Sequence, residues 1–465
     1  MTTPTRDRQP SALVVGGGLA GITAALRLAE AGHRTTLLEA RPRLGGLAFS
    51  FRRGELTVDN GQHVYLRCCT AYRGLVDRLG ANALVDLQPR LDVPVLGLAA
   101  DGTRTLGRLR RAQLPVPLHL AASLATYPHL SPADRLRVVR GALALQRLDL
   151  DDPALDDLSF GDWLRRHGQT PATVEAVWDL VGIATLNATA DRTSMALAAK
   201  VFKTGLLSDP GAADIGMAAV PLGEIHHDRA LAELERAGVR VMLRTKAAEL
   251  KAAEPHAVRL EGGELLTADT VVLAGAQDTA AALLPPGAIP QQQRLAEFGT
   301  APILNVHVVY DRKLLRRPFF AALGSPVQFV FDRTAHSGLA VPGAQYLAVS
   351  QSAAEDEIDL PVAELRARYL PELERLLPAA REARVLDFFV TRERTATFDP
   401  APGTARLRPG ARTGMPGVLL AGSWTATGWP ATMEGAVRSG HAAADAALAG
   451  TGWLPEDRGD GRWPR

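Results

Sequence analysis

Three glycines near the N-terminus, Gly16, Gly18 and Gly21, have the spacing of a loop that binds the pyrophosphate of a dinucleotide. The first glycine permits a tight turn, the second lets the backbone approach the phosphates, and the third lets a helix pack closely on a strand. Glu39 follows 18 residues after Gly21, where a carboxylate can accept hydrogen bonds from a ribose. The pattern therefore predicts that the chain binds a dinucleotide.

The segments around this motif predict the elements that position it. Residues 13–15 are an apolar run typical of a buried strand, residues 21–31 predict a helix that Gly32 ends, and residues 35–38 predict a second strand. The helix N-terminus would offer N–H donors and the positive end of its dipole to phosphates. A tight turn without a nucleotide is the alternative, but the complete order of strand, turn, helix, strand and acid favours binding.

A second group of basic and small residues follows the acid: Arg41, Arg43, Gly45 and Gly46. Such a loop suits a passage across the phosphates of a bound cofactor. Near the C-terminus, residues 418–421 predict a last buried strand, and Gly422 separates it from a helix expected over residues 432–448. The N-terminus of that helix would favour negative charge on a bound ligand.

Residues 39–46 match the signature Glu-Ala-x-x-Arg-x-Gly-Gly, and the chain resembles the superfamily of FAD-dependent amine oxidases and phytoene desaturases. The resemblance implies an α/β fold, in which a discontinuous Rossmann-type FAD-binding domain holds an inserted α+β substrate domain. The chain departs from the superfamily at Leu47, where many members have arginine, and at Ser423, where an acid is usual. The residues that the resemblance implies for binding FAD are Gly16, Gly18, Gly21, Glu39, Arg41, Arg43, Gly45, Gly46, Gly61, Ala247, Gly422, Ser423, Met433, Glu434 and Ala436.

Two further stretches narrow the resemblance. Residues 59–63, Asp-Asn-Gly-Gln-His, and residues 422–440 are similar to the hydroxysqualene dehydroxylases, which are FAD enzymes of bacterial hopanoid biosynthesis. This resemblance spans residues 12–448 and implies reductive removal of the allylic hydroxyl of hydroxysqualene, a C30 isoprenoid, to give squalene. A carotenoid-type desaturase or an amine oxidase, which share the FAD motifs, stays an alternative, as does a non-enzymatic FAD-binding or membrane scaffold protein.

Removal of a hydroxyl needs a proton donor, an apolar cavity and a reduced flavin within reach. By the resemblance, residues 59–63 lie beside the flavin, and His63 is the candidate donor because the ordinary pKa of imidazole suits acid catalysis near neutrality. Asp59 could orient or charge His63, and Gln62 could bind the hydroxyl. In the structural alternative, Gly61 approaches the ring while Gln62 and His63 only satisfy backbone groups.

The domain organisation follows from the order of these motifs. The FAD-binding domain is expected to be built from three separate segments, with the substrate domain in the two gaps and short flexible tails at the ends. The expected ranges are 11–66, 214–283 and 384–450 for the FAD-binding domain, 67–213 and 284–383 for the substrate domain, and 1–10 and 451–465 for the tails.

Composition excludes several functional classes. The 465 residues are 46% hydrophobic with a formal net charge of +2, which is typical of a globular protein and gives no basis for nucleic-acid binding. The two cysteines, Cys68 and Cys69, are adjacent and form no disulfide framework, and His226 and His227 have no further ligands around them, so no metal is expected. Residues 1–10 are polar and lack a secretory signal, which predicts a cytoplasmic protein.

Residues 112–148 are rich in leucine and poor in acids. Composition alone favours ordinary core helices, but an apolar surface with a basic rim would bind a membrane peripherally. Because a C30 substrate is insoluble in water, we expect contact with the inner face of the cell membrane through this segment. The sequence has no second glycine fingerprint for NAD(P)H, so the electron donor for the flavin stays unknown.

Overall fold

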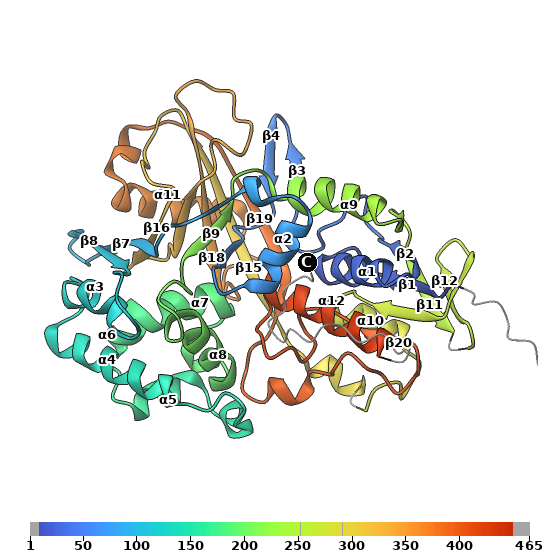
Figure 1. Cartoon of the computed structure of the whole chain (residues 1–465). Helices are drawn as coiled ribbons and strands as arrows, with labels where there is room; N and C mark the ends of the chain where they lie inside the picture. The colour runs from blue at the N-terminus through green and yellow to red at the C-terminus, as the bar shows by residue number, and fades with distance from the viewer. Residues whose placement is uncertain (1–8, 252, 291, 450–465) are drawn as a thin grey trace, which may run out of the picture.

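The computed structural model describes residues 9–449 except residues 252 and 291. It contains two principal β-sheets and a separate group of helices (Figure 1). Apart from residues 9 and 10, the tails expected at 1–10 and 451–465 lie outside the described residues. Within the described part, no helix is both long and apolar enough to cross a bilayer.

A five-stranded parallel sheet carries the glycine motif. Most of its side chains are buried, as expected for a parallel sheet covered on both faces. The strands expected at residues 13–15, 35–38 and 418–421 are confirmed, with small shifts at their ends. In spatial order the strands are β10 (Arg240–Met242), β2 (Arg34–Leu38), β1 (Ser11–Val15), β14 (Thr270–Leu273) and β20 (Val418–Leu420).

Helices and a small sheet cover this parallel sheet. The first helix, α1 (Leu19–Glu30), packs beside the last, α12 (Met433–Leu448), although they lie at opposite ends of the chain (Figure 1). The other covering elements are α2 (Thr70–Arg78), α9 (Ala230–Arg236), α10 (Gln277–Leu283), β11 (Ala247–Lys251), β12 (His256–Leu260) and β13 (Leu265–Ala268).

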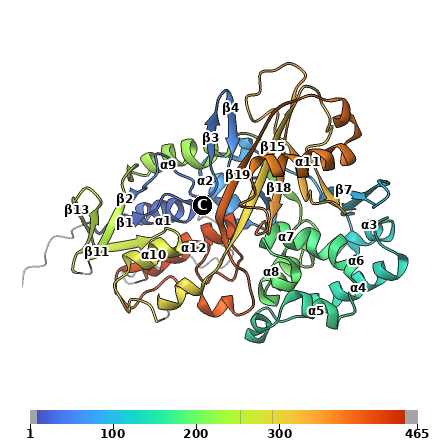
Figure 2. The same ribbon diagram turned by 180° about the vertical axis from the view of Figure 1, so that it is seen from behind.

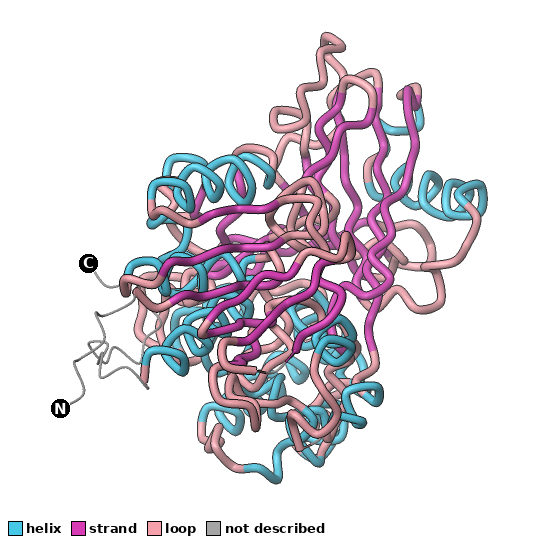
Figure 3. The backbone as a smooth tube through the Cα atoms, turned by 90° about the vertical axis from the view of Figure 1, so that its right-hand side faces the viewer, coloured by secondary structure: helices cyan, strands magenta, loops and turns pink. Residues whose placement is uncertain are grey.

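The second principal sheet has seven strands, which pair antiparallel except for β16 and β7. Its long strands rise steeply from the parallel sheet (Figure 3), and α11 (Val362–Leu376) lies over it when seen from behind (Figure 2). In spatial order they are β19 (Val385–Phe398), β15 (Thr300–Tyr310), β18 (Gln345–Ser352), β17 (Phe329–Asp332), β16 (Phe319–Leu323), β7 (Asp92–Leu98) and β8 (Arg104–Arg110).

One expected domain boundary does not coincide with a sheet boundary. Residues 384–450 were assigned to the FAD-binding domain, yet β19 falls in this range and pairs along β15 in the seven-stranded sheet. The apolar alternation of β19 carries no information about which sheet it joins, because pairing over long sequence separations is a tertiary choice.

A group of helices completes the molecule and lies below the seven-stranded sheet in Figure 1. It comes from residues 121–206, within the first segment expected for the substrate domain. Its members are α3 (Ala121–Ala125), α4 (Pro132–Gln146), α5 (Phe160–Arg166), α6 (Pro171–Thr173), α7 (Leu180–Leu186) and α8 (Met195–Leu206).

Two small sheets place residues 60–63 at the junction of the larger parts. β3 (Ser50–Arg53) pairs with β4 (Leu56–Asp59), and β5 (Val64–Leu66) pairs with β9 (Ile215–Ala218), which also pairs with β6 (Val85–Leu87). The loop between β4 and β5 therefore starts at Asp59 and ends at Val64, and it contains the residues expected to be catalytic.

Candidate functional site

The two groups of glycines lie against each other beside the parallel sheet. A Cβ atom on Gly46 would lie 2.9 Å from Cα of Gly18, which is closer than such atoms approach in proteins. The Gly45 N–H donates to the carbonyl oxygen of Gly17 at 2.9 Å. Side chains here would fill the space between the two loops, so the glycines keep it open.

The N-terminus of α1 meets this space without a side chain to cap it. Gly18 is the N-cap residue, the first turn has no acidic residue, and no side chain caps the helix. A Cβ atom on Gly21 would lie 1.8 Å from the carbonyl oxygen of Gly16, so only glycine lets the helix pack this closely. Uncapped N–H groups at a helix N-terminus bind phosphate well.

Glu39 directly follows β2 and lies beside the same loop, 9% exposed. Its Oε2 accepts from the Gly17 N–H at 2.7 Å, and its Oε1 accepts from the Arg41 N–H at 2.6 Å. These bonds fix the carboxylate and leave lone pairs on both oxygens. The remaining lone pairs suit the hydroxyls of a ribose.

Arg43 borders the second glycine loop. The carbon of its guanidinium lies 3.3 Å from the centroid of the Phe49 ring, and Nη1 donates to the carbonyl oxygen of Gly46 at 3.2 Å. Burial lowers the pKa of Arg43. Arg41 and Leu47 are exposed at the rim, so Arg43 is the arginine that is fixed against this loop.

Two adjacent histidines, on a π-helical turn over Glu224–Arg229, hold the same loop from behind. His226 Nδ1 lies 2.9 Å from the carbonyl oxygen of Ala48, which requires Nδ1 to donate, and Nε2 then accepts from the Tyr72 hydroxyl at 2.9 Å. His227 Nδ1 accepts from the Leu44 N–H at 3.2 Å. Sequence analysis had considered these histidines only as metal ligands and had missed their bonds to this loop.

The loop after β20, which begins at Gly422, is fixed by hydrogen bonds to Ser439 and Arg408. Gly422 has a φ of +142°, and its N–H donates to the Ser439 hydroxyl at 2.8 Å. The carbonyl oxygen of the neighbouring Ser423 accepts from the buried guanidinium of Arg408 at 3.1 Å. Arg408 also donates to the carbonyl oxygens of the next two residues, so a buried cation holds this loop.

Glu434 was expected to bind FAD, but its side chain bonds to the N-terminus of α2. It is 1% exposed, and its carboxylate accepts from the N–H groups of Ala71 at 3.2 Å and Tyr72 at 2.8 Å. It therefore caps α2 and also accepts from Arg438 at 2.7 Å. Thr432 caps α12 by accepting from the Gly435 N–H at 3.1 Å.

Asn60 organises the loop between β4 and β5. Its side chain accepts from the Phe49 N–H at 3.0 Å and donates to Glu393 at 3.0 Å. Its carbonyl oxygen accepts from Asn305 on β15 at 3.1 Å and from Thr391 on β19 at 3.0 Å. The loop is thereby fixed by two strands of the seven-stranded sheet, and sequence analysis missed all of these partners.

His63 and Asp59 do not pair as expected. His63 Nε2 lies 3.3 Å from Oδ1 of Asn60, and burial, followed by the charge of Arg333, lowers the pKa of His63 to about 4. The Asp59 carboxylate instead accepts from Ser50 at 2.6 Å, from a backbone N–H on Leu222 and from Arg333. Asp59 therefore neither orients nor charges His63, which is neutral near pH 7.

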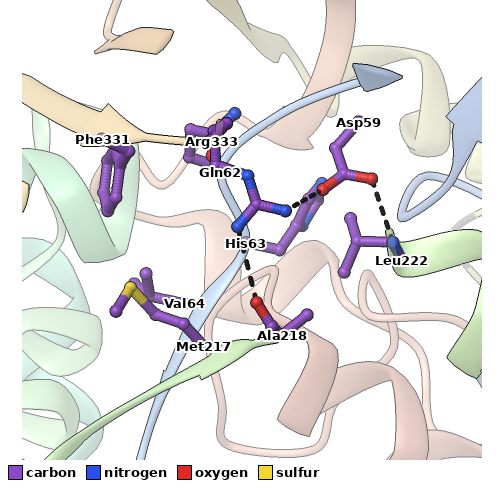
Figure 4. A pocket seen from close by; sticks show the side chains of 9 residues that line it. All are labelled: Asp59, Gln62, His63, Val64, Met217, Ala218, Leu222, Phe331 and Arg333. Carbon is purple, nitrogen blue, oxygen red and sulfur yellow. Dashed lines mark hydrogen bonds and ion pairs between the residues drawn. The ribbon is translucent and has the colours of Figure 1, made fainter. Parts of the chain in front are cut away.

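A small pocket opens beside this loop. Figure 4 shows Phe331, Val64 and Met217 on one side of the Arg333 guanidinium, and Asp59 and Leu222 on the other. Arg333, which follows β17, lies among the polar groups, and its Nη2 donates to Oδ2 of Asp59 at 2.7 Å. No local motif marks this arginine, which is 274 residues from Asp59 in the sequence. The pocket is lined by Asp59, Gln62, His63, Val64, Met217, Ala218, Leu222, Phe331 and Arg333.

The comparisons with known proteins identify the family of the chain. A family model described as "Flavin containing amine oxidoreductase" matches residues 19–448. The chain belongs to this family. It is therefore an FAD-dependent oxidoreductase, as the two glycine loops and Glu39 predicted.

Individual relatives lie in more than one branch of this flavin family. The chain is 30% identical to the hydroxysqualene dehydroxylase of Rhodopseudomonas palustris. The aligned 446 residues cover 94% of this chain and 98% of that protein. It is 26% identical to the 15-cis-phytoene desaturase of Narcissus pseudonarcissus, over 94% of this chain and 79% of that protein. A structure of putrescine oxidase bound to putrescine has the same fold, with a TM-score of 0.72, 21% identity and coverage of 95% and 99%.

The residues at the glycine loops fit the cofactor of the family. The space between Gly18 and Gly46, the uncapped α1 and the fixed carboxylate of Glu39 would hold the pyrophosphate and ribose of FAD. Ala247 begins β11, where it pairs with Leu260. In the part of the chain that the structure describes, no group of three His, Cys, Asp or Glu could hold a metal ion.

Proposed function

We propose that the protein removes the allylic hydroxyl of hydroxysqualene reductively and releases squalene, as a step of hopanoid biosynthesis. The observation that carries the proposal is the small pocket beside the loop from Asp59 to Val64, which combines the polar groups of Gln62, His63 and Arg333 with apolar neighbours. Its volume of about 10 Å³ holds a single hydroxyl group or water. Phe331, Val64 and Met217 offer apolar contacts to the carbon atoms next to that hydroxyl. A relative of nearly equal length that is named a hydroxysqualene dehydroxylase supports the same substrate.

The reaction exchanges a C–O bond for a C–H bond. The C–O bond breaks with its electron pair on oxygen, which leaves as water after gaining a proton. When bound in its reduced form, the flavin supplies the hydride that completes the product. The chain's own residues bind the hydroxyl, exclude bulk water and fix the loop; for these roles we propose Gln62, His63 and, through its ion pair with Arg333, Asp59.

His63 acts in this proposal as a neutral group. With a pKa of about 4, its imidazole is uncharged near pH 7 and cannot serve as an imidazolium acid. A neutral imidazole still offers one hydrogen-bond donor and one acceptor. We therefore assign His63 to hydrogen bonding of the departing oxygen or of the water that protonates it.

The pocket gives less support to the two other chemistries of the superfamily. An amine oxidase binds a substrate that is cationic when protonated, and the only carboxylate among the residues that line this pocket, Asp59, is already paired with Arg333. A desaturase acts on a hydrocarbon, which has no group to pair with the polar side of the pocket. An alcohol on an apolar chain satisfies both sides.

We also propose that the protein binds the inner face of the cell membrane peripherally, through α4. Leu136, Val139 and Leu143 are spaced to lie on one face of this helix, and they are 72%, 42% and 36% exposed. Arg140 is exposed in the same turn as Val139. Apolar side chains flanked by arginine suit the surface of an anionic bilayer, where the C30 substrate resides.

The rest of α4 supports the other interpretation of the leucine-rich segment. Val138 and Leu145 are buried, so the opposite side of the helix belongs to the core. One side of α4 therefore packs in the core, and the membrane proposal concerns only the exposed side. The source of electrons is proposed to be a separate donor, because the described residues contain a single parallel sheet with one glycine fingerprint.

The proposed function is tested with holoenzyme that has been reduced anaerobically before substrate is added. Hydroxysqualene in detergent micelles should reoxidise the flavin, and squalene should appear by mass spectrometry in an amount equal to the flavin. Phytoene and putrescine, added to the oxidised enzyme, should leave the flavin oxidised. Reduction of the flavin by either compound, with no squalene from hydroxysqualene, would refute the proposal.

A further inference from the structure

A buried ion pair borders the pocket and joins Asp59, at the end of β4, to Arg333, which follows β17. The side chains of Arg333 and Asp59 are 12% and 6% exposed, and Nη2 of Arg333 lies 2.7 Å from Oδ2 of Asp59. Removing two charges from water is costly, and an apolar pair of similar size is often as stable. A buried pair that borders a pocket is therefore a candidate for function.

The guanidinium of Arg333 keeps donors available. It has five N–H groups in a planar fork. Within the described residues, Nη2 donates to Asp59 and Nη1 makes a long contact of 3.5 Å with the carbonyl oxygen of Ala218 (Figure 4). Nε has no partner among those residues, and the group borders the pocket. Asp59 fixes one edge of the fork, so the other donors are held in place for a ligand.

The surroundings make Arg333 the cation of this pocket. Of the other lining residues, Asp59 is an anion already paired with Arg333, His63 is neutral near pH 7, and Gln62 carries no charge. Phe331, Val64 and Met217 lie on the far side of the guanidinium from Asp59 in Figure 4. A ligand with an apolar body against these three side chains would present its polar end to Arg333.

We propose that Arg333 is a specificity-determining residue, whose guanidinium binds the substrate hydroxyl and so selects an allylic alcohol over the corresponding hydrocarbon. This inference rests on the proposed function and names the residue that recognises its substrate. Arg333 also stabilises negative charge on the oxygen as the C–O bond breaks, since a fixed cation favours a departing anion. The proton that completes water comes from solvent, because arginine does not lose its own.

The preference for the alcohol over the hydrocarbon follows from the hydrogen-bonding groups of the two molecules. Once the hydroxyl has left, squalene offers no acceptor to the buried donors, and a site built to hydrogen-bond a hydroxyl rejects an analogue that lacks one. Arg333 therefore favours binding of the alcohol and release of the hydrocarbon. The same residue would discriminate against phytoene, the hydrocarbon after which a desaturase among the relatives is named.

The test compares binding, so that it does not depend on turnover. Oxidised holoenzyme is titrated with hydroxysqualene and with squalene in the same micelles, and the change in flavin absorption gives both dissociation constants. Wild-type protein should bind the alcohol about 10- to 150-fold more tightly, the range for a hydrogen bond to a charged group. Arg333→Met should lose this preference while its affinity for squalene stays unchanged.

Two further variants make the result decisive. Arg165→Met removes an exposed arginine that pairs with Asp162 and Asp191, and it should keep the full preference. Arg333→Lys keeps the charge but loses the planar fork, and it should retain a reduced preference. If Arg333→Met does not fold, Arg333→Lys decides, because an unchanged preference in that variant overturns the inference.

The outcomes separate this inference from the proposed function. Equal affinities in the wild-type protein, or a full preference in Arg333→Met, would overturn the role of Arg333. The proposed function would still stand if the reduced wild-type enzyme makes squalene from hydroxysqualene. If it makes none, the function fails, whichever affinities are measured.

Discussion

At the scale of single residues, the cofactor site depends on the absence of side chains. Gly18 has an ordinary φ of −75°, and a Cβ atom there would meet only Cα of Gly46, at 3.6 Å. Gly18→Ala should therefore fold normally and place a methyl group where the pyrophosphate approaches. We expect FAD binding to weaken by about 1–3 kcal/mol, the cost of overpacking.

This prediction is measured by titrating apoprotein with FAD and following flavin fluorescence. Gly262→Ala is the matched control, because a Cβ atom at that position meets nothing within 4 Å. It should leave both the FAD affinity and the melting temperature unchanged. An unaltered FAD affinity in Gly18→Ala would show that the cofactor lies elsewhere.

His63 gives a prediction about pH at the same scale. Since burial and Arg333 lower its pKa to about 4, His63 does not change charge between pH 6 and 8. The rate of flavin reoxidation by hydroxysqualene in a single turnover should be level across this range. His63→Ala should slow that step by about 10²-fold while FAD stays bound, the scale of a lost hydrogen bond to an oxygen that gains negative charge.

The pH profile distinguishes neutral His63 from an imidazolium acid. A rate that falls tenfold per pH unit above pH 6 would indicate that a charged acid is required, contrary to the lowered pKa. Near-normal turnover of His63→Ala would mean that the imidazole only packs against Gly61. The two residues are close, because a Cβ atom on Gly61 would lie 3.3 Å from Nε2 of His63.

At the scale of elements, the exposed side of α4 carries the membrane proposal. Replacing Leu136, Val139 and Leu143 together with serine removes apolar area that is already in water, so the fold should be kept. Flotation with anionic vesicles at low salt should show wild-type protein in the vesicle fraction and at least about tenfold less of the variant, since each buried methylene contributes about 0.8 kcal/mol.

A triple substitution elsewhere is the control for α4. Leu265, Val341 and Val362 are 52%, 49% and 43% exposed and lie outside this helix. Their replacement with serine should not change flotation. Equal flotation of both triple variants, or none for the wild-type protein, would remove α4 as the membrane contact.

Elements also show what the sequence can predict. β1, α1 and β2 follow from a local apolar pattern punctuated by glycine, and their observed bounds agree with it. The partners of Asn60 on β15 and β19 lie 245 and 331 residues away, and nothing near them in the sequence reports this pairing. Arg333 was missed for the same reason, and Glu434 was expected at the cofactor although its carboxylate caps α2.

At the scale of the whole molecule, three distant segments build one parallel sheet. Buried histidines make the stability of this fold depend on pH. His226, 1% exposed, lies beneath the second glycine loop, and burial lowers its pKa to about 4. Unfolding restores a pKa near 6.5, so the unfolded chain binds an extra proton between pH 6.5 and 4. Stability therefore falls as the pH falls through this window, by about 3 kcal/mol for this group.

Denaturant unfolding at pH 7 and pH 4 measures this effect. His226→Gln keeps hydrogen-bonding groups but cannot gain a proton, so the free energy of unfolding should decline about 3 kcal/mol less than in the wild-type protein. The same decline in both proteins would assign the acid sensitivity to other groups, such as His307, whose pKa burial also lowers to about 3.

The central claim is that hydride from the reduced flavin replaces the hydroxyl of an isoprenoid alcohol at this site. The most direct measurement is a single turnover of reduced holoenzyme with hydroxysqualene in deuterated water, because the transferable hydrogen of a reduced flavin exchanges with solvent. Mass spectrometry should find squalene that carries one deuterium, formed as the flavin reoxidises. Unlabelled squalene, or unchanged hydroxysqualene beside a flavin that stays reduced, would contradict the account.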